Sequence, residues 1–129
     1  TLSGGEAARV MLALKVLLTG AVHLPTIIFD EIDTGTSGRI AEAMAHMMRA
    51  MASGEGCQVI AISHLPQIAA AGDVQYLVSK ESDADGNAAT HLTRLDEEQR
   101  VHAIANMLSG ANITEAAIAN AKELLCSSK

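Results

Sequence analysis

One stretch of this chain limits its possible folds more than any other: an apolar run that ends in carboxylates. Residues 26–29 have the length and composition of a buried strand. Asp30, Glu31 and Asp33 follow within four positions. Taking an ionised carboxylate out of water costs a great deal of free energy unless a cation or several hydrogen-bond donors receive it. We therefore expect these carboxylates at an open strand end, facing a metal ion, a metal-bound phosphate or a water molecule.

A second apolar run covers residues 57–62 and is followed by Ser63 and His64. It shows no polar alternation, which is typical of strands in parallel sheets that helices cover on both faces. Ligands of open α/β sheets bind at the carboxyl ends of the strands. The pattern therefore predicts that His64 shares a sheet edge with Asp30, although a lone histidine after a strand is often structural.

The N-terminal segment begins with a helix-start pattern. Ser3 and Glu6 match a capping box, in which each side chain accepts a hydrogen bond from the other residue's backbone amide. Gly4 and Gly5 lie between them, and a glycine inside a helix costs about 1 kcal/mol relative to alanine. Ser3 can be a cap and nothing more, but the glycines favour a second interpretation. They would let an anion approach the exposed amides of the helix start closely.

The remaining pattern predicts an α/β fold with a mostly parallel sheet core, flanking helices and one β-hairpin. The N-terminal helix should extend to Leu18 and end at Gly20, with protein covering most of its circumference. The other expected elements have clear start and stop signals. They are a helix from Thr36 or Ser37 to Ala52 with Ile40, Met44, Met47, Met48 and Met51 on its buried face, a short helix 66–72, hairpin strands 74–80 and 89–95, and two helices capped by Asp96 and Thr114.

The composition limits the class of protein. The chain has 129 residues, which suits one domain over 1–129, and its 49% hydrophobic content with 2% aromatic residues requires an aliphatic core. No apolar run approaches the roughly 20 residues of a membrane span, and no signal peptide is evident, so we expect a cytoplasmic protein. The net charge of −6 argues against nucleic-acid binding by this chain alone. Cys57 and Cys126 suit ordinary thiols.

These residues suit phosphoryl transfer from a nucleotide to water. Asp30 can bind Mg²⁺, and Glu31 can orient or deprotonate the attacking water. His64 can donate a hydrogen bond to the terminal phosphate, while the helix start at Ser3 can cradle it. The sequence contains no Gly-Lys pair and therefore no phosphate-binding loop of the GxxxxGK[ST] type. We expect the chain alone to lack a complete ATP site and to be inactive.

The motifs resemble those of ABC-type ATPases in order and spacing. Residues 2–6, Leu-Ser-Gly-Gly-Glu, resemble the ABC signature motif, and residues 27–31 resemble the Walker B strand with its adjacent glutamate. Asp33 falls in the position of the D-loop and His64 in that of the switch histidine. Within that superfamily, the segments 30–35, 63–69 and 95–98 resemble the RecN family of bacterial DNA repair proteins, which are relatives of the SMC proteins. The resemblance covers nearly the whole chain.

The resemblance implies an architecture and a function. Full-length members carry a Walker A motif in an N-terminal lobe, then a coiled coil, then a C-terminal lobe like this chain. Two such ATPase heads form a homodimer with ATP between them. The expected function is ATP hydrolysis during DNA double-strand break repair and recombination, in a nucleoid-associated protein that contacts DNA through its full length.

The same resemblance implies roles for individual residues. Asp30 would bind Mg²⁺, and Glu31 and His64 would be catalytic for the nucleotide of their own head. Asp33 of the D-loop would lie near the dimer interface and contribute to nucleotide binding. The residues that would bind the nucleotide of the neighbouring head belong to the signature motif, and they are Ser3, Gly4, Gly5 and Glu6.

Other interpretations remain open. The chain could be a fragment of another ABC- or SMC-type head. It could be a stand-alone metal-dependent phosphohydrolase with Asp30, Glu31, Asp33 and His64 as ligands. It could also be a non-enzymatic assembly module that pairs through an apolar surface.

Overall fold

The computed structural model describes residues 3–33, 35–36, 38–54 and 56–129. This part of the chain folds into five helices and two separate two-stranded sheets. The elements in chain order are α1 (Gly4–Val22), β1 (Thr26–Asp30), α2 (Gly38–Ser53), β2 (Gln58–Ile62), α3 (Pro66–Ala71), β3 (Tyr76–Ser82), β4 (Ala88–Arg94), α4 (Glu97–Ser109) and α5 (Glu115–Ser127). The predicted mixture of a small parallel sheet, flanking helices and a hairpin is confirmed.

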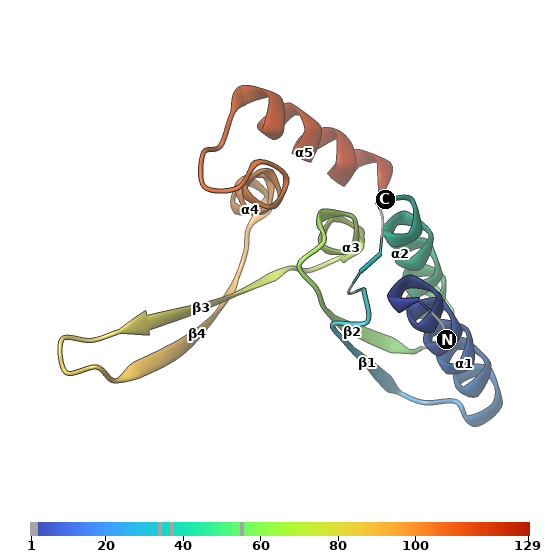
Figure 1. Cartoon of the computed structure of the whole chain (residues 1–129). Coiled ribbons are helices and arrows are strands. Elements are labelled where there is room, and N and C mark those ends of the chain that lie inside the picture. Colours follow the sequence, from blue (N-terminus) through green and yellow to red (C-terminus); the bar gives the residue numbers. More distant parts are fainter. Residues whose placement is uncertain (1–2, 34, 37, 55) are drawn as a thin grey trace.

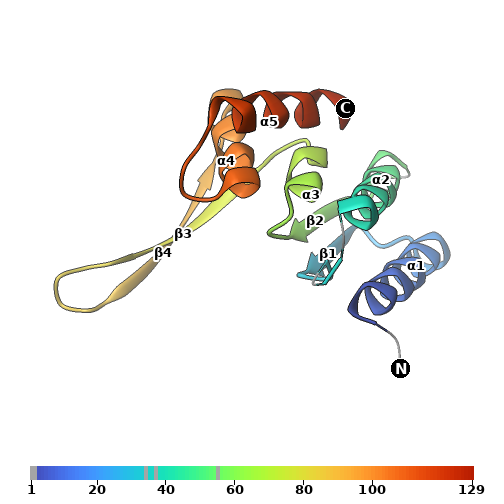
Figure 2. The ribbon, with the colours of Figure 1, turned by 45° about the horizontal axis from the view of Figure 1, so that its top comes forward.

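The elements form two groups that meet at α3 (Figure 1). In one group α1 and α2 lie beside the parallel sheet of β1 and β2, and in the other α4 and α5 lie beside α3. The antiparallel hairpin of β3 and β4 extends away from both groups, which Figure 2 shows from a second direction.

The parallel sheet buries only one of its faces. Ile27 and Phe29 of β1 point into a core cluster together with Leu12 of α1, Met44 of α2 and Ile68 of α3. The alternate positions form the other face, where large apolar side chains are about half exposed: Ile28, Ile60 and Ile62. The expectation that helices cover both faces is therefore wrong for the described residues, because all three helices that reach the sheet contribute to the same cluster.

Helix α2 begins and ends close to its predicted bounds, but its buried face is shifted. The buried residues follow the spacing i, i+3, i+4, i+7 and are Ala41, Met44, Ala45 and Met48. Met47 was expected on this face, yet it is 38% exposed. Ala41 and Ala45 are buried in its place, and Ile40 and Met51 pack against the core while partly buried.

Helix α1 differs from its prediction in length and in coverage. It continues through Gly20 to Val22, and His23, with a φ of 50°, follows its last residue. A side chain at Gly20 would meet open space, so no contact ends the helix there. Leu12 is buried, but Leu14 and Leu17 are 50% and 69% exposed. Protein therefore covers only a narrow stripe of α1 within the described residues.

The C-terminal half agrees closely with its local signals. The Asp96 side chain accepts from the Gln99 amide and the Gln99 side chain from the Asp96 amide, so the predicted capping box is confirmed. Thr114 caps α5 by accepting from the Ala117 amide. The apolar faces of α4 and α5 bury Ile104, Ala105, Ala117 and Ala121 against Ala70 of α3. None of the described helices is long and apolar enough to cross a membrane.

Candidate functional site

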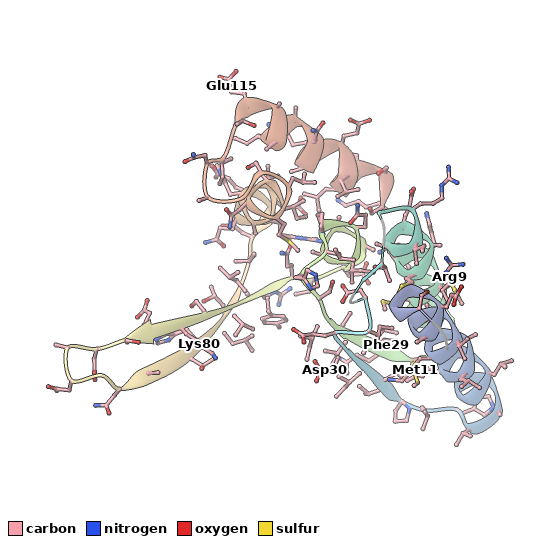
Figure 3. All side chains as sticks on the ribbon, in the orientation of Figure 1. Arg9, Met11, Phe29, Asp30, Lys80 and Glu115 are labelled. Atoms are coloured by element: carbon pink, nitrogen blue, oxygen red, sulfur yellow. The ribbon has the colours of Figure 1, made fainter. Side chains whose placement is uncertain are left out.

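The carboxyl ends of the two parallel strands bring three of the predicted site residues to one edge. Asp30, the last residue of β1, lies opposite Ile62, the last residue of β2. The Glu31 amide then donates to the Ile62 carbonyl at 2.9 Å, which extends the strand pairing by one step. His64 follows two residues after Ile62, and all three candidate side chains are exposed. In Figure 3, Phe29 lies on the side of β1 that faces α1, whereas Asp30 lies on the other side.

Glu31 has an unusual backbone conformation. Its φ is 51°, in the left-handed region that favours glycine. A non-glycine residue in this region costs about 1–3 kcal/mol, and such residues concentrate at functional sites. This turn directly follows Asp30, the last residue of β1, and both adjacent carboxylates are exposed.

Asp33 does not lie in the open position expected for it. It is 2% exposed, and its Oδ2 accepts a hydrogen bond from the Ser63 hydroxyl. The chain turns back after Glu31, which carries Asp33 underneath the strand ends, whereas Asp30 and Glu31 stay at the surface. Its expected role at a dimer interface stays a prediction.

The loop after Asp33 is held by its own hydrogen bonds. The Thr36 amide and hydroxyl both donate to the Asp33 carbonyl, at 3.1 and 2.7 Å. The Thr36 hydroxyl is thus engaged with Asp33, and Ser37, the other candidate cap of α2, lies outside the described residues. So does Thr34.

The glycine-rich start of α1 lies against this loop. The predicted capping box is confirmed, because the Ser3 amide donates to Glu6 Oε2 at 3.0 Å and the Glu6 amide to Ser3 Oγ at 3.2 Å. A Cβ at Gly5 would lie 3.8 Å from the Gly35 carbonyl oxygen, an ordinary contact distance. It would also lie 3.7 Å from Ile40 Cδ1, and Gly5 itself is buried. Ser3, Gly4 and Glu6 are exposed, and Leu2 lies outside the described residues.

A second set of carboxylates lies at the tip of the hairpin, far from this edge. Asp83 accepts hydrogen bonds from the backbone amides of Asn87 at 2.8 Å and Asp85 at 3.0 Å. The backbone hydrogen bond from Asn87 is the main cause of the lowered pKa of Asp83. The carboxylate is thus used in closing the turn, which agrees with a structural role.

Sequence reasoning missed two arginines that hold the end of α3. Arg100 of α4 is 7% exposed and donates to the carbonyls of Ala69 and Gly72, at 3.3 and 2.8 Å. Arg49 of α2 donates to the Ala71 carbonyl at 2.6 Å and pairs with Asp73. The last carbonyls of a helix have no partner within it, so these cations satisfy them and complement the helix dipole. Nothing in the local sequence pattern marks either arginine for this position.

Comparison with known proteins gives strong sequence matches over nearly the whole chain. The DNA repair proteins RecN of Vibrio cholerae and Haemophilus influenzae are 44% and 43% identical to it over 123 residues, which is 95% of this chain. By sequence, the chain corresponds to the C-terminal part of RecN proteins. It spans 22% of the length of these two RecN relatives. No protein-family model matches the chain.

The RecN-like chain also has a structural relative. A solved structure from work on the ATP-driven dimerisation and DNA-stimulated activation of SMC ATPases matches it with a TM-score of 0.67. The match covers 86% of this chain and 65% of the other at 22% identity, so the likeness concerns the fold. The RecN-like chain thus shares its fold with part of this SMC ATPase structure.

The positions of Asp30 and Asp33 limit how a metal ion could bind at this edge. The described residues contain no cluster of three or more His, Cys, Asp or Glu side chains placed to hold a metal ion. This weakens the stand-alone phosphohydrolase interpretation, which needs Asp33 as a ligand beside Asp30 and His64. Mg²⁺ instead commonly binds through one or two carboxylates together with water and substrate phosphates. The exposed Asp30 fits that limited role.

Proposed function

We propose that this chain is the C-terminal half of a RecN-type ATPase head. It hydrolyses ATP after an N-terminal lobe with a Walker A motif completes the site, during repair and recombination of broken DNA in the bacterial cytoplasm and nucleoid. The observation that carries the proposal is the shared sheet edge, where Asp30, Glu31 and His64 end two paired strands. The left-handed backbone at Glu31 supports it further.

Each side chain at the edge has a distinct task in this proposal. Asp30 binds Mg²⁺, which neutralises developing charge on the phosphate oxygens when it is present. Glu31, in the turn that follows Asp30, orients the attacking water and accepts its proton. His64 donates a hydrogen bond to the terminal phosphate from the neighbouring strand end.

A second head completes the proposed site. The exposed Ser3, the amides of Gly4 and Gly5, and Glu6 would bind the terminal phosphate held by the partner head, since a helix start offers unpaired amides and a positive dipole end. ATP-driven dimerisation is described for the structural relative, and we extend it to this chain as a homodimer of heads.

The exposed apolar surface supports the need for an N-terminal lobe. The open sheet face carries Ile28, Ile60 and Ile62, and α1 exposes Leu14 and Leu17. Large exposed apolar patches usually mark interaction sites. We assign these surfaces to the N-terminal lobe, while contacts with DNA belong to the full-length protein, because this chain carries a net charge of −6.

The decisive experiment replaces the proposed general base in the full-length protein. Glu31→Gln keeps the shape of the side chain but removes its basicity, so we expect ATP turnover to fall about 100-fold or more. ATP-driven pairing of heads should persist, because binding does not require proton transfer. Steady-state ATPase assays and light scattering with ATP measure the two properties.

Glu42→Gln on the exposed face of α2 is the matched control and should leave turnover unchanged. Normal turnover in Glu31→Gln would rule out Glu31 as the base. A phosphoesterase activity of this chain without any N-terminal lobe would instead favour the stand-alone hydrolase.

A further inference from the structure

The Asp33 carboxylate is buried and only half satisfied. It is 2% exposed, and its Oδ1 has no hydrogen-bond partner among the described residues. Its other oxygen, Oδ2, accepts from the Ser63 hydroxyl. A buried carboxylate with one unpaired oxygen is costly, and few buried polar atoms in native proteins lack a partner. Stability alone therefore gives a poor reason for an aspartate here.

The Ser63 hydroxyl connects this carboxylate to the segment that contains His64. While it donates to Asp33 Oδ2, the same oxygen accepts from the Leu65 amide at 3.0 Å. His64 lies between Ser63, which carries this hydroxyl, and Leu65, whose amide donates to it. The backbone on both sides of His64 is therefore held by one side chain.

Hydrogen bonds also hold the backbone around Asp33. Its carbonyl accepts from the Thr36 amide and hydroxyl, and two residues earlier the Glu31 amide is bound to the Ile62 carbonyl. The turn that contains Glu31 and the turn that contains His64 thus meet at two points. One is the backbone hydrogen bond at the strand ends, and the other is the buried pair beneath it.

We propose that Asp33 and Ser63 are positioning residues that couple the Glu31 turn to the His64 turn. The inference rests on the proposed ATPase function and adds to it a link within one head. A hydrogen bond to a carboxylate is about twice as strong as one between neutral groups, so an aspartate at this position holds Ser63 more firmly than an asparagine amide could. In this proposal the pair acts on the reaction through Glu31 and His64, whose backbone segments it connects.

The test uses the full-length protein and four variants. Ser63→Ala removes the link, Asp33→Asn weakens it at constant shape, their combination tests whether they act together, and Ser63→Thr restores a hydroxyl. We expect kcat to fall roughly tenfold or more in Ser63→Ala and less in Asp33→Asn, with the KM for ATP nearly unchanged. The double variant should be no slower than Ser63→Ala, and Ser63→Thr should recover most of the rate.

Ser53→Ala is the matched control, because it removes a serine hydroxyl that also donates a hydrogen bond, here to the Arg49 carbonyl at 2.7 Å and away from the sheet edge. It should leave kcat unchanged. Hydrogen exchange gives a second measurement that does not depend on activity. Asp33→Asn should speed exchange at residues 63–65, and Ser63→Ala should speed it at residues 31–36.

The results separate this inference from the proposed function. If Glu31→Gln abolishes turnover while Ser63→Ala and Asp33→Asn keep a normal kcat, the coupling is wrong and the proposed function stands. Additive losses in the double variant would also contradict the coupling. If the wild-type protein hydrolyses no ATP, the proposed function fails, and the catalytic role of the pair fails with it.

Discussion

Among the described residues, two that are not glycine adopt a left-handed backbone conformation, and comparing them separates the effect of strain on stability from the effect of the side chain on function. Glu31 has a φ of 51° and His23 a φ of 50°. Glycine reaches this region without steric cost, so glycine at either position should relieve strain. His23 follows the last residue of α1, where left-handed residues commonly end helices. Glu31 lies at the proposed catalytic edge.

We predict that Glu31→Gly and His23→Gly each raise the free energy of unfolding of the full-length protein by about 1 kcal/mol or less. Glycine relieves the backbone strain, but it also makes the unfolded chain more flexible, which offsets part of the gain. Only Glu31→Gly should abolish ATP turnover. Thermal unfolding and ATPase assays measure the two effects. A loss of stability in both variants would show that the side-chain contacts outweigh the strain.

At the scale of elements, the capping box of α4 offers a local test. Asp96→Ala removes the acceptor for the Gln99 amide, whose hydrogen bond is 2.8 Å long. We expect a loss of about 1 kcal/mol, as for other helix caps. Hydrogen exchange of the first turn of α4 should accelerate, whereas Asp85→Ala at the hairpin tip should leave that turn unaffected. Unchanged exchange would mean that packing alone holds the start of α4.

The contact between α4 and α3 depends on the buried guanidinium of Arg100. Arg100→Met keeps an apolar stem but leaves the carbonyls of Ala69 and Gly72 without their donor. We expect stability to fall by about 3 kcal/mol, since buried acceptors lose their partners. Denaturant unfolding of the full-length protein measures the loss.

Arg94→Met on the exposed hairpin strand is the control and should change stability by less than about 0.5 kcal/mol. Arg100→Lys should recover only part of the loss, because an ammonium cannot reproduce the planar fork of donors. Full recovery by lysine would indicate that charge rather than geometry matters at this position.

At the scale of the whole molecule, the open face of the parallel sheet is the surface that needs a partner. Ile60 lies in the middle of this face and is 41% exposed, and Leu108 on α4 is exposed to the same degree. A charged side chain is costly inside an apolar interface but harmless in water. The two leucine-sized residues therefore make a matched pair for testing where an N-terminal lobe binds.

We predict that Ile60→Glu weakens association of this chain with a co-expressed N-terminal lobe by tenfold or more, whereas Leu108→Glu does not. Co-purification with ATP and titration of the separated lobes measure the association. Equal weakening by both substitutions would mean that the sheet face is not the specific binding surface. No weakening by either would mean that the N-terminal lobe does not bind the sheet face.

The sequence alone determined most elements and which residues lie at one sheet edge. The Asp96 and Thr114 caps, the two apolar runs and the turn between β3 and β4 are local signals, because each depends on residues a few positions apart. Since parallel strands end at the same edge, the sequence also placed Asp30 and Glu31 next to His64. The RecN resemblance followed from the same motifs and was confirmed.

Only the tertiary structure decided which surfaces are buried and which residues meet over long separations. Asp33 and Ser63 are 30 positions apart, and Arg100 reaches Gly72 across 28. Such contacts depend on how the elements pack, and a carboxylate at a strand end looks the same in sequence whether it faces water or turns beneath the sheet. Coverage of a sheet depends likewise on where the helices lie, so the apolar pattern of β2 could not reveal that one of its faces stays open.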